Sequence, residues 1–296
     1  MANKEEILFK CESLKKPLFS FDETEKKVKI ESKSEDRLGS YLAGLIEGDG
    51  YISINNKKKV ILGITLNLKD KPLAEKLLNL IGIGFIVKRK SSSIELRFTS
   101  KISLCRIIKL VNGKFRTPKI DQLFKLIDWI NLNHAMNFSK LPLDLTPLNN
   151  NSWLSGFIDS DGGFYIRHSL KQIICKFNLE QRMLYPKTLE SYKPILDLIC
   201  LNFNVKLGIR NRTNYKNSYY IIRVENQKST KILIDYLDKF PLFSSKYLDY
   251  LDWKKAFLII INKTHLSEKG RNNILLFKNS MNTNRTYFNW DHLNKI

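Results

Sequence analysis

The fold is decided by one stretch of sequence that occurs twice, as YLAGLIEGDGYISI at residues 41–54 and as WLSGFIDSDGGFYI at residues 153–166. In both copies an aromatic residue and Leu come first, Gly is the fourth residue, and an acid, a small residue, Asp and Gly occupy the seventh to tenth places. Asp49 and Asp161 occupy the same place in the two copies, 112 residues apart. A repeat of this length predicts two structurally similar halves.

The repetition continues downstream of each motif. The segments NGKFRTPKIDQLFKLIDW at 112–129 and FPLFSSKYLDYLDW at 240–253 each place a lysine, Lys119 or Lys246, after a turn. In both, a predicted helix with an Asp-Trp pair follows that lysine. The second half has extra residues around LEQRMLYPKTLESYK at 179–193, so the two copies have diverged.

A linker separates the halves. SKLPLDLTPLNNN, at 139–151, contains two prolines that block helix formation, followed by three asparagines. The expected organisation is a polar, loosely ordered extension at 1–35, a first half at 36–138, a linker at 139–152, a second half at 153–262 and a basic tail or appended element at 263–296.

Each half predicts the same series of elements. The motif predicts a helix, which runs from about Leu38 to Asp49 in the first copy. Alternation of apolar and polar residues predicts strands, and longer apolar periodicity ending near Gly predicts helices. The predicted strands include residues 51–56, 60–68, 85–90, 93–100, 205–212 and 223–227, and the predicted helices include 73–82, 103–113, 196–203 and 230–240. The fold class is therefore α+β, with two pseudo-symmetric α-β-β-α-β-β-α halves and antiparallel sheets.

Composition excludes several classes of protein. The 296 residues carry a formal net charge of +21 and are 43% hydrophobic, which indicates a globular chain that binds a polyanion such as nucleic acid. No apolar run approaches the length of a membrane span, so no membrane association is expected. The four cysteines and four histidines are scattered, which argues against disulfides, zinc sites and zinc-protease chemistry. Any metal is expected to bind to oxygen.

The residue usage also bears on origin. The first 19 residues have neither a secretory signal nor an acid-poor transit peptide. Lys, Asn, Ile, Tyr and Phe are plentiful, and they use A/T-rich codons, which fits an organellar genome. We therefore expect translation inside an organelle, a mitochondrion before a chloroplast.

Small residues on the motif helices predict close helix packing. Gly44 and Gly48 lie four residues apart on one helix face, and so do Gly156 and Ser160. Small residues at this spacing let two helix backbones approach closely. The two motif helices should therefore pack against each other and bring Asp49 and Asp161 together.

The helix C-terminus is an unfavourable place for carboxylates, because it carries about half a unit of negative charge. Each motif nevertheless ends with two acids, Glu47 and Asp49 or Asp159 and Asp161. A cation between the two ends would relieve the repulsion, and Mg²⁺ binds to one or two carboxylates together with phosphate oxygens and waters. This arrangement suits metal-assisted phosphodiester hydrolysis.

LAGLIEGDG at 42–50 and LSGFIDSDG at 154–162 resemble the two signature motifs of double-motif LAGLIDADG homing endonucleases. The TPK around Lys119 and the SSK ending at Lys246 also match family patterns, and the resemblance covers roughly residues 36–262. It implies a pseudo-twofold monomer with motif helices packed at the interface and two sheets forming a saddle over duplex DNA. The one departure at a motif acid is Glu47, where the family usually has Asp.

The resemblance also implies site residues and cofactors. Asp49 and Asp161 would bind Mg²⁺ at the scissile phosphates, Mn²⁺ would substitute, and Ca²⁺ would support binding without efficient cleavage. Lys119 and Lys246 stand where the family often has a basic residue that polarises water. Gln181 resembles a polar residue near the metal-bound water in some members. The inner acids of the motifs, and Trp129 and Trp253, are expected to be structural.

Residues on the exposed strand faces are the expected DNA contacts. The alternation turns Lys88 and Lys90, then Glu95 and Arg97, to one side. Arg and Lys suit guanine edges, and Asn and Gln suit adenine. Divergence between the halves predicts an asymmetric target. The expected contacts are Ser53, Asn55, Lys88, Lys90, Arg97, Arg167, Lys206, Arg210, Arg212 and Arg223.

Three functions are compatible with these features. The first is a sequence-specific, Mg²⁺-dependent endonuclease for double-stranded DNA, because both motif aspartates are intact. The second is an RNA-binding intron maturase, a splicing cofactor on the same scaffold, since a basic surface serves either polymer. The third is a transcription regulator that binds DNA without cutting it.

Overall fold

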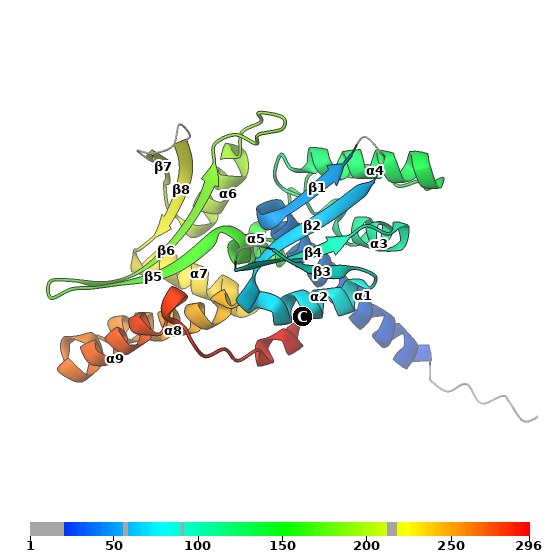
Figure 1. Ribbon diagram of the computed structural model, residues 1–296. Helices are drawn as coiled ribbons and strands as arrows, with labels where there is room; N and C mark the ends of the chain where they lie inside the picture. The colour runs from blue at the N-terminus through cyan, green and yellow to red at the C-terminus, as the bar shows by residue number, and fades with distance from the viewer. Residues whose placement is uncertain (1–20, 56–58, 90–91, 212–217) are drawn as a thin grey trace, which may run out of the picture. The chain divides into compact units, whose positions relative to one another are not determined.

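The computed structural model describes residues 21–55, 59–89, 92–211 and 218–296 (Figure 1). The chain divides into two units, Met1–Asp36 and Arg37–Ile296, and the second unit contains both sheets. The predicted DNA contacts Lys90 and Arg212 lie outside the described residues.

Helix α1 (Phe21–Asp49) begins well before Leu38. The expectation of a loosely ordered extension is therefore wrong from Phe21 onward. This segment is rich in Glu and Lys and has no Pro or Gly before Gly39. Glu and Lys are good helix formers, so a polar composition that we interpreted as disorder also suits a helix.

The two halves share one order of elements. After α1, the first half has β1 (Gly50–Ile54), β2 (Val60–Asn67), α2 (Lys71–Ile81), β3 (Phe85–Lys88), β4 (Ser93–Phe98), α3 (Lys101–Val111) and α4 (Ile120–His134). The second half has α5 (Trp153–Asp161), β5 (Gly162–His168), β6 (Ile173–Arg182), α6 (Lys193–Phe203), β7 (Leu207–Asn211), β8 (Ser218–Val224), α7 (Gln227–Lys239) and α8 (Lys246–Ile261). The α+β class and the repeated series are confirmed. Each series is followed by one more helix, α4 directly after Lys119 and α8 beginning at Lys246.

The two antiparallel sheets have the same topology, β1-β2-β4-β3 and β5-β6-β8-β7. The predicted strand at 223–227 overlaps β8 only at Arg223 and Val224, because β8 begins at Ser218 and ends at Val224. Asn226 instead caps α7 by accepting a hydrogen bond from the Ser229 N–H at 2.9 Å. Its short polar side chain favours a cap over a strand.

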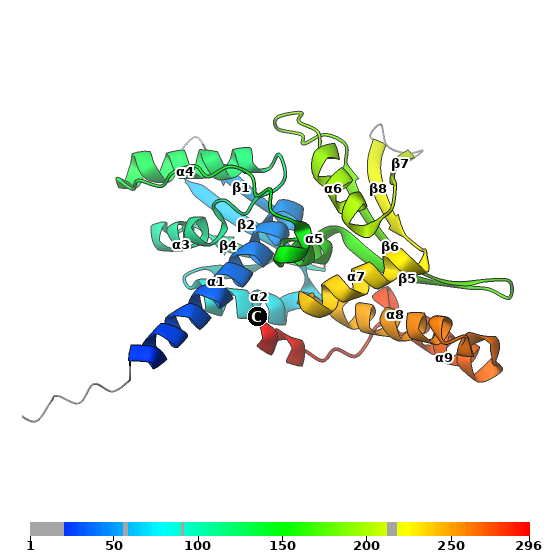
Figure 2. The same cartoon turned by 180° about the vertical axis from the view of Figure 1, so that it is seen from behind.

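One face of each sheet is covered and the other is open. Figure 2 shows α3 and α4 over the first sheet and α6 and α7 over the second. The covered faces bury large apolar residues, whereas most alternate residues on the open faces reach solvent. The buried residues include Leu62, Ile64, Leu96, Phe98, Phe164, Phe177, Leu179, Ile222 and Val224.

The motif helices α1 and α5 contact each other backbone to backbone. A Cβ placed on Gly44 would lie 2.0 Å from the Trp153 carbonyl oxygen, and one on Gly156 would lie 2.0 Å from that of Tyr41. A Cβ on Gly48 would lie 2.2 Å from the Ser160 Cβ. Only glycine fits at these positions, so the predicted close packing of the motif helices is confirmed.

The C-terminal segment is an ordered part of the second unit. Helix α9 (Glu268–Asn279) packs on α8 and buries Ile274, and Met281 and Leu293 are also buried. Arg285 donates hydrogen bonds to Asp249 and Asp252 of α8 at 2.9 and 2.7 Å. In the described part of the chain, no helix has the length and apolar character needed to cross a membrane.

Gly156→Ala should destabilise the protein by about 3 kcal/mol, because the added methyl group collides with a backbone carbonyl that cannot move without separating the helices. Gly208→Ala is the matched control, since its Cβ would meet its nearest atom, in the Ile221 side chain, at 3.2 Å. Urea denaturation of both variants measures the difference. Equal midpoints would contradict the close packing of α1 and α5.

Candidate active site and nucleic-acid face

Asp49 and Asp161 are the last residues of α1 and α5, and they lie close together. A Cβ on Gly48 would be only 3.4 Å from Asp161 Oδ2. The Asp161 carboxylate is half-buried and accepts a hydrogen bond from Gln181 Nε2 at 3.0 Å. The Asp49 side chain reaches solvent, and no described residue donates a hydrogen bond to it. The predicted meeting of the two aspartates is therefore present.

The surroundings of these carboxylates disfavour their charge. Desolvation by the protein around it, followed by the negative charge of Asp49, raises the pKa of Asp161 to about 6. Desolvation also raises the pKa of Asp49, although Lys246 and Lys119 oppose the rise. An added cation would relieve this repulsion, and carboxylate oxygens suit a hard divalent ion. Among the described residues no group of three or more His, Cys, Asp or Glu that could hold a metal ion is found.

Lys119 and Lys246 bind to the backbone at the ends of the motif helices. Lys119 Nζ donates to the carbonyl oxygens of Ile46, Gly48 and Gly50 at 3.1, 3.0 and 2.9 Å. The lysine ammonium groups therefore bind carbonyl oxygens at the helix ends and offset the negative end of each helix dipole. Burial lowers the pKa of Lys119 to about 8 and also lowers that of Lys246.

The second half repeats this arrangement. Lys246 Nζ donates to the carbonyl oxygens of Ile158 and Ser160 at 3.3 and 2.7 Å. Each lysine is held by the turn before it, because its backbone N–H donates at 3.2 Å to the hydroxyl of Thr117 or Ser244.

The inner motif acids, Glu47 and Asp159, hold these turns. Glu47 is fully buried and accepts hydrogen bonds from the backbone N–H groups of Arg116 and Thr117 and from Thr117 Oγ1. Burial raises the pKa of Glu47 to about 7, although these hydrogen bonds oppose the rise. Asp159 accepts in the same way from the N–H of Phe243 and from the N–H and hydroxyl of Ser244. Both acids are structural, as expected.

These acids also join the two halves. Trp153 Nε1, in the second motif, donates to Glu47 of the first motif at 2.6 Å. Tyr41 Oη, in the first motif, donates to Asp159 of the second motif at 2.8 Å. Each aromatic residue that begins a motif thus binds to the inner acid of the other motif. The sequence contained both partners, but no spacing signal pairs residues 106 and 118 positions apart.

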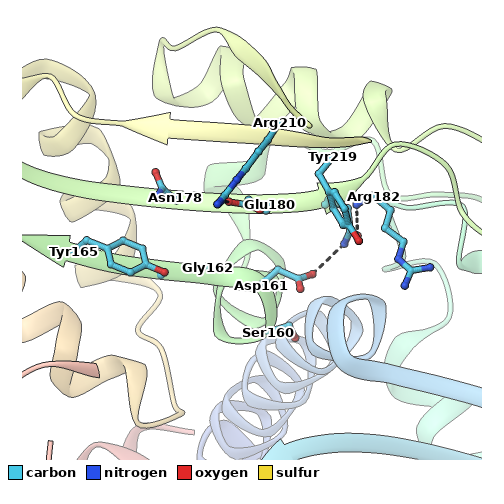
Figure 3. A pocket seen from close by; sticks show the side chains of 11 residues that line it. Ser160, Asp161, Gly162, Tyr165, Asn178, Glu180, Arg182, Arg210 and Tyr219 are labelled. Atoms are coloured by element: carbon cyan, nitrogen blue, oxygen red, sulfur yellow. Dashed lines mark hydrogen bonds and ion pairs between the residues drawn. The ribbon is translucent and has the colours of Figure 1, made fainter. Parts of the chain in front are cut away.

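A hollow of about 530 Å³ lies on the second sheet beside Asp161 (Figure 3). Gln181 lines it, and its amide nitrogen binds Asp161 while its amide oxygen accepts from the Arg182 N–H at 2.8 Å. All five predicted catalytic residues therefore gather at the ends of the motif helices. The residues lining the hollow are Ser160, Asp161, Gly162, Gly163, Tyr165, Asn178, Glu180, Gln181, Arg182, Arg210 and Tyr219.

Three further contacts between the halves were not predicted. The loop of extra residues before α6 reaches the first half, where Tyr185 accepts a hydrogen bond from Gln122 of α4 and Lys187 Nζ lies 3.4 Å from the Ile52 carbonyl oxygen. Asp70, before α2, accepts from the Ser245 N–H at 2.6 Å. The insertion was visible as a length difference, but nothing in its spacing indicated its partners.

The strand register sorts the predicted DNA contacts by face. Ser53 and Arg97 lie on the open face of the first sheet, and Arg167, Arg210 and Arg223 lie on that of the second. The exposed residues Asn55 and Lys206 lie just outside β1 and β7, and Asn55 Oδ1 accepts from the Lys59 N–H in the turn.

The prediction that Lys88 and Arg97 lie on the same side of the sheet is wrong. It pairs with Ile94 and therefore lies on the covered face. Because β3 has only four residues, its alternation alone could not show which side faces the core. The next residue, Arg89, was missed. It forms an ion pair with Glu95, which lies on the open face.

Comparison with known proteins identifies the family. The family described as LAGLIDADG endonuclease matches residues 42–130 and 154–257, and the chain belongs to this family. "Intron-encoded DNA endonuclease aI3" of Saccharomyces cerevisiae is 32% identical over 87% of this chain and 72% of its own length. "Uncharacterized cox1 intron-2 37.2 kDa protein" of Schizosaccharomyces pombe is 33% identical over 83% of this chain and 73% of its own length.

Two further similarities concern RNA and the fold. "Intron-encoded RNA maturase bI4" of Saccharomyces cerevisiae is 27% identical over 80% of this chain but only 34% of its own length. The structure of the I-SmaMI LAGLIDADG homing endonuclease bound to cleaved DNA aligns with a TM-score of 0.64 at 23% identity. That alignment covers 84% of this chain and 98% of the other, which supports the two-half fold.

Trp153→Phe should destabilise the protein by about 1–2 kcal/mol, because it removes a hydrogen bond to the buried Glu47. Trp253→Phe is the matched control, since the buried Trp253 Nε1 has no hydrogen-bond partner. Thermal and urea denaturation of the two variants measure the difference. A larger loss of stability for Trp253→Phe than for Trp153→Phe would show that the hydrogen bond from Trp153 to Glu47 contributes little to stability.

Proposed function

We propose that this chain is a sequence-specific homing endonuclease that hydrolyses phosphodiesters of a long, asymmetric double-stranded DNA target with Mg²⁺. The observation that carries this proposal is the meeting of Asp49 and Asp161 at the ends of two helices whose backbones are in contact. The net charge of +21 and the open sheet faces also support it, because a basic surface attracts DNA phosphates.

The residues have distinct roles in this proposal. Asp49 and Asp161 hold the divalent ion, for which Mn²⁺ can substitute, while Ca²⁺ supports binding without efficient cleavage. A bound ion of this kind supplies a Lewis acid and lowers the pKa of a bound water. Lys119 and Lys246 place positive charge where negative charge develops on the phosphate. Gln181 orients the Asp161 carboxylate through its hydrogen bond.

DNA binding is assigned to the open faces of both sheets and to the exposed residues beside β1 and β7. In the first half we propose Ser53, Asn55 and Arg97. In the second half we propose Arg167, Lys206, Arg210 and Arg223. The halves carry different residues, so the target need not be palindromic. Because one chain supplies both aspartates, a monomer is sufficient for both strands.

An intron maturase is the second candidate, because a relative that carries this name covers most of the chain. The two functions separate in one experiment, in which the protein and Mg²⁺ are added to the intron-less insertion locus and to the precursor RNA. Double-strand cleavage supports the endonuclease, and intact DNA with faster splicing supports the maturase. We also propose a mitochondrial location, which the A/T-biased residue usage and the name of the cox1 intron relative support.

Asp49→Asn and Asp161→Asn should each slow cleavage by more than about 1,000-fold, because a neutral amide cannot replace a carboxylate ligand of a hard ion. Cleavage of a plasmid with the target is measured in Mg²⁺, and target binding is measured separately in Ca²⁺. Asp121→Asn on α4 is the control, since its partner is the surface residue Lys125. Full cleavage by either active-site variant would refute the assignment.

Lys119→Met and Lys246→Met should each slow cleavage by about 100-fold with little loss of target binding. The two lysines bind to the ends of different motif helices, Lys119 to α1 and Lys246 to α5, so each single variant should accumulate nicked plasmid and the double variant should leave it supercoiled. Lys254→Met is the control, because it removes the same charge from α8 at a distance from the aspartates. Equal slowing of both strands by each single variant would contradict separate roles.

A further inference from the structure

An unusual acid lies on the open face of the first sheet. Glu95 of β4 has a side chain that is only 1% exposed, although its neighbours on that face reach solvent. A carboxylate on a surface that meets DNA would repel phosphates. A carboxylate at this position therefore needs an explanation, and the contacts of Glu95 indicate one.

Glu95 holds two arginines and a tyrosine. Its Oε1 accepts from Arg97 Nε at 2.7 Å and its Oε2 accepts from Arg97 Nη2 at 3.2 Å. Arg89 forms an ion pair with Oε2, and the Tyr51 hydroxyl donates to Oε1. Burial alone would raise the pKa of Glu95, but the hydrogen bonds from Arg97, Tyr51 and Arg89 hold it below its ordinary value. The carboxylate is therefore a fixed, ionised anchor.

The backbone leaves room for this cluster. Gly63 of β2 lies between Tyr51 and Arg97 in the strand register. A Cβ on Gly63 would lie 2.5 Å from the Tyr51 ring and 2.8 Å from Glu95 Oε1. The ring can cross β2 to reach Glu95 only because residue 63 has no side chain. The cluster is thus part of the sheet rather than a chance contact of mobile surface groups.

Arg97 is held in one orientation but is not buried. Glu95 engages its Nε and Nη2 atoms, and 21% of the side chain remains exposed. The guanidinium has five N–H groups in a rigid plane, so two bonds to Glu95 fix its direction and leave Nη1 uncommitted to that carboxylate. An arginine fixed in this way loses little conformational freedom when it binds a planar partner.

The open face of the second sheet also holds an arginine paired with an acid, although at different strand positions. Arg210 of β7 forms an ion pair with Glu180 of β6 across β8, and both line the hollow beside Asp161 (Figure 3). This pair is more open, with 49% of the Arg210 side chain exposed. An arginine held by an acid on each open face argues that the pairing serves the ligand of these faces.

We propose that Arg97, oriented by Glu95, reads a guanine in the major groove of the first half of the target. This inference rests on the DNA binding that the proposed function includes. A guanine edge presents two acceptors, O6 and N7, without a full negative charge, and it matches the arginine fork. A phosphate is a poorer match, because Glu95 repels it and reduces the formal charge of the Arg89–Glu95–Arg97 cluster to +1.

The test is target selection from a DNA library randomised over the first half-site, by cleavage in Mg²⁺ and by binding in Ca²⁺. The wild type should require guanine at one position. Arg97→Lys and Arg97→Ala should relax that requirement by about 10- to 100-fold and leave the other positions unchanged. Arg97→Lys keeps the charge, so its salt dependence of binding should match the wild type.

Two further variants make the assignment specific. Lys88→Met is the matched control, because Lys88 is an exposed cation of the same sheet on the covered face. Glu95→Gln keeps the size of the side chain but weakens its hold on Arg97, so the preference for guanine should fall. Among targets that differ only at other positions, the ranking by cleavage rate should stay the same as for the wild type. Circular dichroism and melting curves confirm that each variant is folded.

The outcomes separate this inference from the proposed function. A guanine requirement that survives in both Arg97 variants would overturn the inference. So would an Arg97→Ala variant that binds all targets more weakly and lowers the salt slope by about 1, which is the behaviour of a phosphate contact. If the wild type binds guanine-containing targets but cuts none, the endonuclease function fails and the inference stands. If 7-deazaguanine at the selected position weakens the wild type but not Arg97→Ala, the contact is assigned to N7.

Discussion

The contact between the backbones of α1 and α5 is the constraint on which the rest of the structure depends. Gly44 and Gly156 each lie against a carbonyl of the opposite helix, so no side chain separates the two axes. This contact brings two helix C-termini together, and with them the negative ends of two dipoles. The motifs then add four carboxylates to the same region. The two lysines and the donors around Glu47 and Asp159 compensate this concentration of negative charge.

The two acids of each motif differ in the groups that surround them. Residues two apart on a helix point in nearly opposite directions, so Glu47 and Asp49 meet different surroundings. Glu47 faces inward, where backbone N–H groups, a hydroxyl and the Trp153 indole surround it. Asp49 faces outward and receives no such donors from the described residues. The lysines complete the pattern by binding the helix carbonyls, which leaves the outer aspartates as the groups whose charge an added ion would balance.

The sequence predicted the parts of this structure that depend on local pattern. The repeat gave the two halves, the glycine spacing gave the helix contact, and the matched turns gave Lys119 and Lys246. It could not give the bond from Trp153 to Glu47 or the bond from Tyr41 to Asp159, because those bonds join residues more than 100 positions apart. It failed at Lys88 because a four-residue strand does not define its own inner side. It failed from Phe21 because Glu- and Lys-rich helices and disordered segments share a composition.

The two halves are similar but not equivalent at the centre. Gly50 pairs with Ile64 and Gly162 pairs with Leu179, so Leu66 and Gln181 occupy matching positions two residues further along. Asp161 therefore has an amide partner where the first half has an apolar side chain. The extra loop before α6 also belongs to the second half alone, and it contacts α4 beside the Lys119 turn. A twofold arrangement of backbone thus carries two chemically different carboxylate sites. Such a scaffold is suited to a duplex whose two strands differ in sequence, because each half can change its side chains without disturbing the helix contact that both require.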